Sequence, residues 1–173
     1  DNAEAFCDAK QAFITRQNEA PIALQTEAAN QQHYELPAKF FSAVLGPHLK
    51  YSCGFWRDTD ATLEQSERHG LEDTCRFAQL ADSQKILELG CGWGSLTLWM
   101  AQQYPHSTIT AVSNSRSQAQ HIRAKAESIG LGNVEVITCD MNDFDTALGQ
   151  FDRIVSVEMF EHMRNYGHLY LSL

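Results

Sequence analysis

The stretch that decides the fold is residues 85–95, KILELGCGWGS, in which a short apolar run leads into three alternating glycines. Ile86, Leu87 and Leu89 predict a buried strand, and the glycines end it. Residues 95–104 then place apolar side chains at the spacing of an amphipathic helix. Strand, glycine turn and helix are the geometry by which α/β folds hold a nucleotide-like ligand, because glycine lets the backbone approach the ligand and the helix N-terminus offers unpaired N–H groups. A purely structural turn is the alternative for this stretch taken alone.

Composition narrows the class of protein. The 173 residues are 43% hydrophobic and 20% charged, which is typical of one soluble globular domain. The net charge of −9 argues against a nucleic-acid partner, and no apolar run is long enough to span a bilayer, so we expect no stable membrane insertion. The five cysteines never form a CxxC pair, which favours reduced thiols in the cytoplasm over disulfides or a bound metal.

Strands and helices alternate along residues 61–173. We expect strands at 86–89, 108–112, 134–139 and 151–157, with helices at 95–104 and 115–129 and another starting at Thr62. This order predicts an α/β fold with a doubly wound, Rossmann-like parallel sheet and a ligand crevice at the carboxyl ends of its strands. We expect the sheet to be truncated after its fourth strand, with the C-terminal strands and the original start of the chain absent. Residues 1–60 predict helices that form either a lid over the crevice or a packing extension.

Polar residues at the strand ends bear on the cofactor. A dinucleotide enzyme usually places an acid about 20 residues beyond its glycines. Ser113 and Asn114 stand there instead, which disfavours NAD. Asp140, after the third strand, suits acceptance of a hydrogen bond from an adenine amino group, and a helix cap is the alternative.

Four motifs carry a resemblance to a known family: YSCGFW at 51–56, LELGCGWGS at 87–95, SNSRSQ at 113–118 and RIVSVEMFEHMRNY at 153–166. They resemble the cyclopropane-fatty-acyl-phospholipid synthase family of S-adenosylmethionine-dependent methyltransferases, over a stretch from about Gln32 to Tyr166. VEMFEHMRNY looks most similar to the amine N-methyltransferases, such as the coclaurine N-methyltransferases, because cyclopropane synthases tend to have glycine at the position of Glu158. The resemblance implies a class I methyltransferase fold and methyl transfer to the nitrogen of a small amine.

The resemblance also implies roles for individual residues. Tyr51 and Ser52 would reach the carboxylate of S-adenosyl-L-methionine, and Ser113 and Gln118 its ribose; a capping box, S-x-x-Q, is the alternative for Ser115 and Gln118. The full set of implied cofactor-binding residues is Tyr51, Ser52, Glu88, Gly90, Gly92, Gly94, Ser113, Gln118, Asp140, Met141 and Asn142. Cys53 matches a cysteine that lies near a bound bicarbonate in cyclopropane synthases, and a small buried hydrophobe is its ordinary alternative.

Glu158, Glu161 and His162 are the candidate catalytic residues. Their i, i+3, i+4 spacing would place them on one face of a helix. A substrate amine must be neutral to attack, so Glu161 or His162 would take its proton, and such general-base help is worth about 10²–10⁴-fold. On spacing alone, a solvated helix with a Glu–His pair is the alternative.

Aromatic side chains attract cations, and Tyr34, Trp56, Phe160 and Tyr166 are the candidate walls for a substrate amine. Two other functions stay open beside amine methylation. One is cyclopropane synthesis on lipid acyl chains with the same cofactor, and the other is a cofactor-binding fragment without catalysis. The expected partner is a small-molecule amine, and a homodimer is an open alternative for the assembly.

Overall fold

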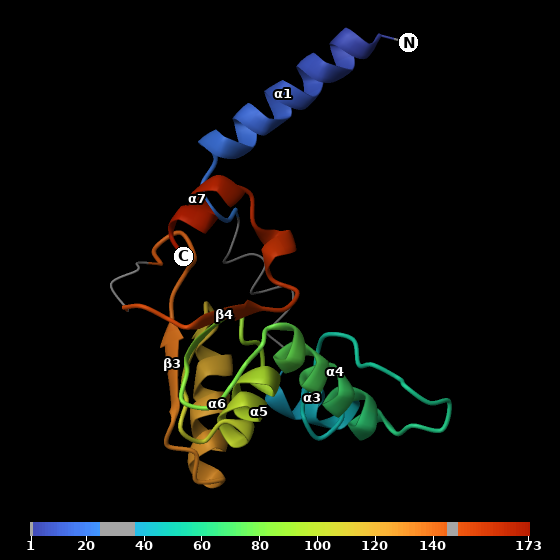
Figure 1. Cartoon of the computed structure of the whole chain (residues 1–173), viewed down its shortest axis with the longest axis vertical. Helices are drawn as coiled ribbons and strands as arrows, with labels where there is room; N and C mark the ends of the chain where they lie inside the picture. Colours follow the sequence, from blue (N-terminus) through green and yellow to red (C-terminus); the bar gives the residue numbers. More distant parts are fainter. Residues whose placement is uncertain (1, 25–36, 145–148) are drawn as a thin grey trace.

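A four-stranded parallel sheet forms the centre of the protein (Figure 1). The computed structural model describes residues 2–24, 37–144 and 149–173. The strands lie in the order β3-β2-β1-β4, and they are β1 (Lys85–Leu89), β2 (Thr108–Ser113), β3 (Val134–Thr138) and β4 (Arg153–Ser156). In the register, Glu88 of β1 lies opposite Ala111 of β2 and Val155 of β4. The strand order reverses beside β1, so the ligand crevice of such a sheet is expected at the carboxyl end of this strand.

The strand β1 is buried on both faces, as its continuous apolar run predicts. Ile86 packs on one side with Leu71 of α4 (Leu63–Phe77) and Met100 of α5 (Ser95–Gln103). Leu87 and Leu89 pack on the other side in a cluster that includes Leu169 of α7 (Tyr166–Leu171). The predicted strands and the doubly wound parallel arrangement are confirmed, although β4 is shorter than expected.

The predicted helices begin and end where their capping residues stand. Thr62 caps α4 in a complete capping box with Gln65. Ser115 caps α6 (Arg116–Ser128) by accepting a hydrogen bond from the Gln118 N–H, and Gly130 follows its end with a φ of +73°. These caps fix both ends of the helix that packs against β3.

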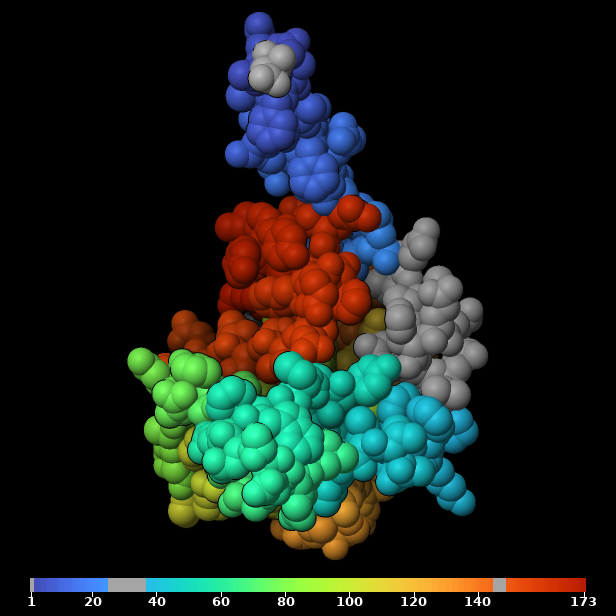
Figure 2. All heavy atoms as spheres, turned by 90° about the vertical axis from the view of Figure 1, so that its right-hand side faces the viewer, coloured from blue at the N-terminus to red at the C-terminus, as the bar shows by residue number. Residues whose placement is uncertain are grey.

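Two helices lie in the described N-terminal part, whereas residues 45–60, which were also expected in the helical part, form no helix. Figures 1 and 2 show α1 (Ala3–Glu19) projecting from the rest of the molecule, and it buries none of its residues. The shorter α3 (Ala38–Val44) buries Phe41, whose ring lies 4.9 Å from that of Trp93. In the part of the chain that is described, no helix is both long and apolar enough to cross a membrane.

Residues 18–24, here named the strap, comprise the end of α1 and the segment that follows it. The Asn165 amide donates hydrogen bonds to the carbonyls of Asn18 and Ala20, and Ala23 forms an isolated antiparallel bridge with Met163. The strap therefore lies beside the segment that carries the candidate catalytic residues.

Candidate active site

A cavity of about 190 Å³ lies at the carboxyl end of β1. Eight of the predicted site residues line it: Tyr51, Ser52, Glu88, Gly90, Gly92, Glu158, Glu161 and His162. The rest of its wall is Leu49, Cys91, Trp93, Ser95, Leu96 and Val157. Cofactor-binding and catalytic candidates that lie far apart in the sequence therefore meet in one cavity.

The glycine turn between β1 and α5 forms the floor of this cavity. Gly90, Gly92 and Gly94 all have left-handed backbones, with φ of +79°, +53° and +85°. A Cβ atom on Gly94 would lie 2.6 Å from Ile122, and one on Gly90 would lie 2.7 Å from Met159, whereas one on Gly92 would meet nothing within 4 Å. Gly90 and Gly94 are thus required for packing, and Gly92 leaves the turn open toward the cavity.

Glu88 is a buried acid in the wall of the cavity. Its carboxyl group accepts a hydrogen bond of 2.5 Å from Thr97 Oγ1, and only 4% of the residue is exposed. Burial raises the pKa of Glu88 to about 8, although the Thr97 hydrogen bond acts in the opposite direction. The group is therefore protonated at neutral pH until a nearby positive charge favours its ionised form.

Ser113 and Gln118 lie together at the end of β2. Ser113 Oγ is 2.8 Å from Gln118 Oε1, so the Gln118 side chain turns toward Ser113 and does not complete the capping box with Ser115. Among the residues that the structure describes, Gln118 Nε2 is buried and has no hydrogen-bond partner, and the same holds for Trp93 Nε1 and Ser95 Oγ, two side chains in the cavity wall. Buried polar atoms normally have partners, so these atoms fit a polar ligand with hydroxyl and charged groups.

The loop after β3 has structural partners of its own. Met141 is buried in the core cluster with Leu87, and Asn142 pairs with Ala23 of the strap through both its amide oxygen (3.0 Å) and its amide nitrogen (3.1 Å). Asp140 accepts hydrogen bonds from the Asn142 N–H and side-chain amide through Oδ1. Asp140 Oδ1 thus fixes the Asn142 amide that holds the strap.

The candidate catalytic residues do not share one helix as predicted. Glu158 has a φ of +52°, and only Glu161 and His162 belong to η2 (Phe160–His162), a single 3₁₀ turn. The prediction of a common helix face is therefore wrong. All three side chains still line the cavity, because the left-handed residue redirects the chain immediately after β4. A left-handed backbone costs a residue other than glycine about 1–2 kcal/mol, so Glu158 is held at a position where glycine is easier to accommodate.

Three of the four aromatic substrate candidates lie outside the cavity lining. Trp56 is 54% exposed, Phe160 packs against Tyr170 with ring centroids 6.0 Å apart, and Tyr166 donates a hydrogen bond to the Phe160 carbonyl. Tyr34 falls outside the described residues. The structure therefore joins the cofactor and acid–base candidates without joining the predicted aromatic walls to them.

A second cavity, of about 610 Å³, shares Ser52, Val157 and Glu158 with the first. Lys50 lines it, and burial lowers the pKa of this lysine although Cys53, Glu158 and Glu67 act to raise it. Lys50 Nζ also donates a hydrogen bond to Ser52 Oγ. Cys53 is exposed here, so the alternative of a small buried hydrophobe is wrong.

Sequence reasoning missed several residues of the site. Trp93 and Ser95 adjoin the glycines, so their positions alone could have suggested contact with the cavity. Thr97 lies in the first turn of α5, and nothing in the neighbouring sequence indicates its hydrogen bond to Glu88. The role of Lys50 depends on the packing of α4 and cannot be read from its neighbours in the chain.

The sheet is parallel, a buried acid and a glycine turn stand at the end of its first strand, and acidic residues follow its fourth strand. These features define a class I S-adenosylmethionine-dependent methyltransferase fold. The chain belongs to the mycolic acid cyclopropane synthetase family, whose family model matches residues 23–171.

Known proteins of this family include both amine and lipid enzymes. The chain is 39% identical to (S)-tetrahydroprotoberberine N-methyltransferase of Eschscholzia californica, over 88% of this chain and 43% of that protein. It is 37% identical to cyclopropane-fatty-acyl-phospholipid synthase of Escherichia coli K12, over 79% of this chain and 34% of that protein. The crystal structure of coclaurine N-methyltransferase bound to N-methylheliamine and SAH superposes with a TM-score of 0.89 at 38% identity, covering 94% of this chain and 46% of that one. The chain thus spans less than half the length of these relatives.

Proposed function

We propose that this chain is the cofactor-binding part of an enzyme that transfers a methyl group from S-adenosylmethionine to the nitrogen of a small amine. The observation that carries the proposal is the single cavity in which the glycine turn, buried Glu88 and the turn of Glu158, Glu161 and His162 meet. The similarity to amine N-methyltransferases supports the same reading.

The residues around the glycine turn fit the cofactor. When bound, S-adenosylmethionine supplies a methyl group on a positively charged sulfonium sulfur. Gly92 leaves room for close approach of a ligand to the backbone. A positive charge of the ligand near Glu88 would favour the ionised form of this buried acid. The Gln118 side chain, whose Nε2 has no partner among the described residues, is suited to the ribose, and the Asp140 carboxylate is suited to the adenine amino group.

The acidic turn supplies the proton transfer that an amine requires. An ammonium nitrogen has no lone pair, so it must lose a proton before it can attack. His162 or Glu161 takes that proton, directly or through water, and Glu158 opposes the positive charge of the substrate. Both base candidates are exposed at the cavity, where they remain within reach of an entering amine.

Cyclopropane synthesis on a lipid is the second candidate. The specific observation in its favour is Cys53, which lies with Lys50 in the larger cavity, where a small anion would find a positive charge. Glu158 lines the same cavity and repels an anion, which favours the amine. A fragment that binds the cofactor without catalysis is the third outcome that an assay can reveal.

We infer a cytoplasmic location from the thiols. All five cysteines are free, and burial raises the pKa of both Cys75 and Cys91. Unpaired thiols are typical of a reducing compartment. The homodimer stays a prediction.

The test is binding followed by turnover in the full-length protein. Calorimetry with S-adenosylmethionine and SAH comes first, then transfer of a radiolabelled methyl group to a panel of secondary and tertiary amines and, separately, to unsaturated phospholipid vesicles. We expect labelled amines and unlabelled lipid. Labelled lipid without labelled amine would favour cyclopropane synthesis, and absence of cofactor binding would remove both enzyme functions.

The acid–base turn has its own test. Glu161→Ala and His162→Ala are expected to lower kcat by about 10²-fold or more, because each removes a candidate for general-base catalysis. Cofactor affinity should stay within a few-fold, since most of the wall is unchanged. His168→Ala, an exposed histidine on α7 outside the cavity lining, is the matched control. A large loss of cofactor affinity in the two cavity variants would show that these residues bind the cofactor instead.

A further inference from the structure

Glu67 is a buried carboxylate that neither cavity includes in its wall. It lies in the middle of α4, only 1% of it is exposed, and it accepts three hydrogen bonds from backbone N–H groups. Gly46 and Lys50 donate to Oε1 at 3.0 and 3.1 Å, and His48 donates to Oε2 at 3.0 Å. One side chain thus holds three N–H groups within a stretch of five residues.

These three N–H groups belong to a segment without regular structure. Residues 46–52 form neither a helix nor a strand, so no ladder of backbone hydrogen bonds fixes their path. Buried backbone N–H groups need acceptors, and here the Glu67 carboxylate serves as the common acceptor. The position of residues 46–50 therefore depends on Glu67.

Glycines allow this segment to lie directly against α4. A Cβ atom on Gly46 would collide with the Glu67 carboxylate, and one on Gly54 would lie 2.5 Å from Ser66 Oγ. On the helix side, a Cβ on Gly70 would lie 2.8 Å from Lys50 Cε. Contact this close leaves the segment little freedom to shift along the helix.

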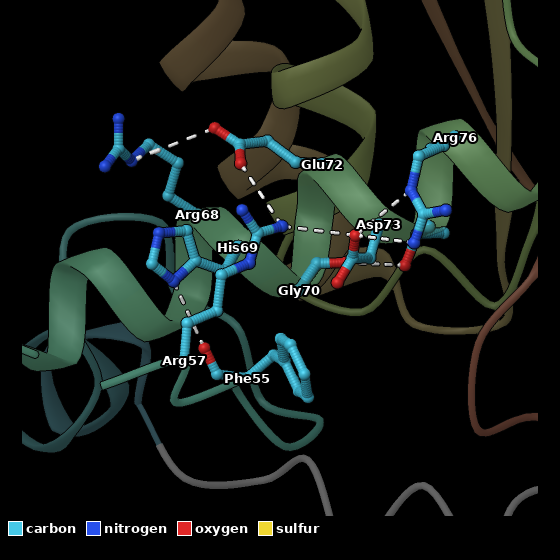
Figure 3. A network of polar contacts seen from close by, with 9 residues as sticks. Phe55, Arg57, Arg68, His69, Gly70, Glu72, Asp73 and Arg76 are labelled. Atoms are coloured by element: carbon cyan, nitrogen blue, oxygen red, sulfur yellow. Dashed lines mark hydrogen bonds and ion pairs between the residues drawn. The ribbon is translucent and has the colours of Figure 1, made fainter. Parts of the chain in front are cut away.

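The same helix, α4, also holds the chain just beyond this segment, at residues 55–57 (Figure 3). The Phe55 N–H donates to the Ser66 carbonyl at 2.8 Å, and the His69 ring lies 3.3 Å from the Phe55 carbonyl. Arg57 reaches Asp73 at 3.2 Å, and Figure 3 shows this pair joined to Arg76 in one network on the exposed side of α4. Exposed ion pairs contribute little, so the buried bonds of Glu67 hold the segment more firmly than this network.

Tyr51 and Ser52 lie between the two points of attachment, and both line the cofactor cavity. We infer that Glu67 is a positioning residue, which acts through residues 46–50 to place Tyr51 and Ser52 against the amino-acid end of the cofactor. This inference rests on the proposed function. It predicts that Glu67 affects recognition of the amino-acid end of the ligand and leaves recognition of its adenosine end unchanged.

Glutamine is a sharp probe of this role because it keeps the size of the side chain and removes one acceptor. An amide has a single oxygen, so its NH₂ group must face an N–H donor at one of the two positions. If the oxygen faces Gly46 and Lys50, the bond from His48 is lost, and in the opposite orientation two bonds are lost. Glu67→Gln therefore loosens the segment in either orientation.

The experiment measures the affinity of the full-length protein for two ligands that differ at one end. SAH carries the amino-acid group, whereas 5′-methylthioadenosine has the same adenosine and lacks it. We expect Glu67→Gln to raise the Kd for SAH about tenfold, the usual scale for losing a charged hydrogen bond, and to leave the Kd for 5′-methylthioadenosine within about twofold. Glu64→Gln, which changes an exposed carboxylate on the same helix, should alter neither value.

Gly46→Ala tests the same contact from the segment side and should show the same split between ligands, so it replaces Glu67→Gln if that variant does not fold. Equal loss of both ligands, or no loss of either, would overturn the role of Glu67 while leaving the proposed function intact. Failure of the unaltered protein to bind either ligand would instead overturn the proposed function, and the role of Glu67 with it.

Discussion

The floor of the cavity and the strap beside the site are built in different ways. The floor is continuous in sequence: Glu88 precedes the glycine turn, and its hydrogen-bond partner Thr97 is nine residues away. The strap is joined to the site by distant residues, since Asn142 is 119 residues from Ala23 and Asn165 is 147 residues from Asn18. Local sequence therefore determines the floor of the cavity, and long-range contacts determine how the strap packs beside the site.

The largest expected effect comes from the floor. Gly94→Ala should lower the free energy of unfolding by about 3 kcal/mol, because it adds left-handed strain to a collision with buried Ile122. Gly92→Ala carries the strain without the collision and should cost about 1 kcal/mol. Chemical denaturation measures both values, and equal costs would contradict the distinction between a packing glycine and an open one. Because its Cβ faces the cavity, Gly92→Ala should in turn weaken SAH binding more than its small cost in stability suggests.

The next effect concerns the pH dependence of stability through Glu88. The pKa of this group is about 8 in the folded protein and near 4.5 without burial. Between these values the folded state keeps a proton that the unfolded chain has released, so the free energy of unfolding falls as pH rises and levels off above pH 8. The expected fall between pH 6 and 8 is about 2 kcal/mol.

Glu88→Gln should abolish this contribution, so the free energy of unfolding of the variant subtracted from that of the unaltered protein isolates the effect of Glu88. Subtraction is needed because burial lowers the pKa of His121, which contributes a slope of opposite sign. Urea denaturation at several pH values measures both curves. Parallel curves would mean that Glu88 is already ionised in the folded protein.

The smallest effect is expected at the strap. Asn142→Ala removes the two hydrogen bonds to Ala23 and should lower the free energy of unfolding by about 1 kcal/mol. Hydrogen exchange provides the local measurement: the Ala23 amide should exchange faster, while the amides of β1 keep their protection. Asp143→Ala, an exposed neighbour, is the control. Uniformly faster exchange would indicate that the strap and the sheet open as one unit.

These contrasts explain how much the sequence could predict. The apolar run at 86–89, the glycines and the Ser115 cap are local signals, and they predicted the sheet, the helices and the cavity floor. The φ of +52° at Glu158 has no such signal, so a helix was predicted where a turn redirects the chain. Met141 and Asn142 were predicted to contact adenine from the resemblance, whereas their contacts with the core and the strap depend on residues far away in the chain.

The position of β4 also has a consequence for how the chain folds. The Lys85 N–H donates to the side chain of Asp152, 67 residues later, whereas the N–H of Gln84, just before β1, donates to Ser107 Oγ, only 23 residues later. Contacts between distant residues form slowly because a longer loop must close first. During synthesis, β1 and β2 can therefore pair before the ribosome has delivered β4. The turn of Glu158, Glu161 and His162 then docks after the pairing of β1 and β2, onto a glycine turn that already exists.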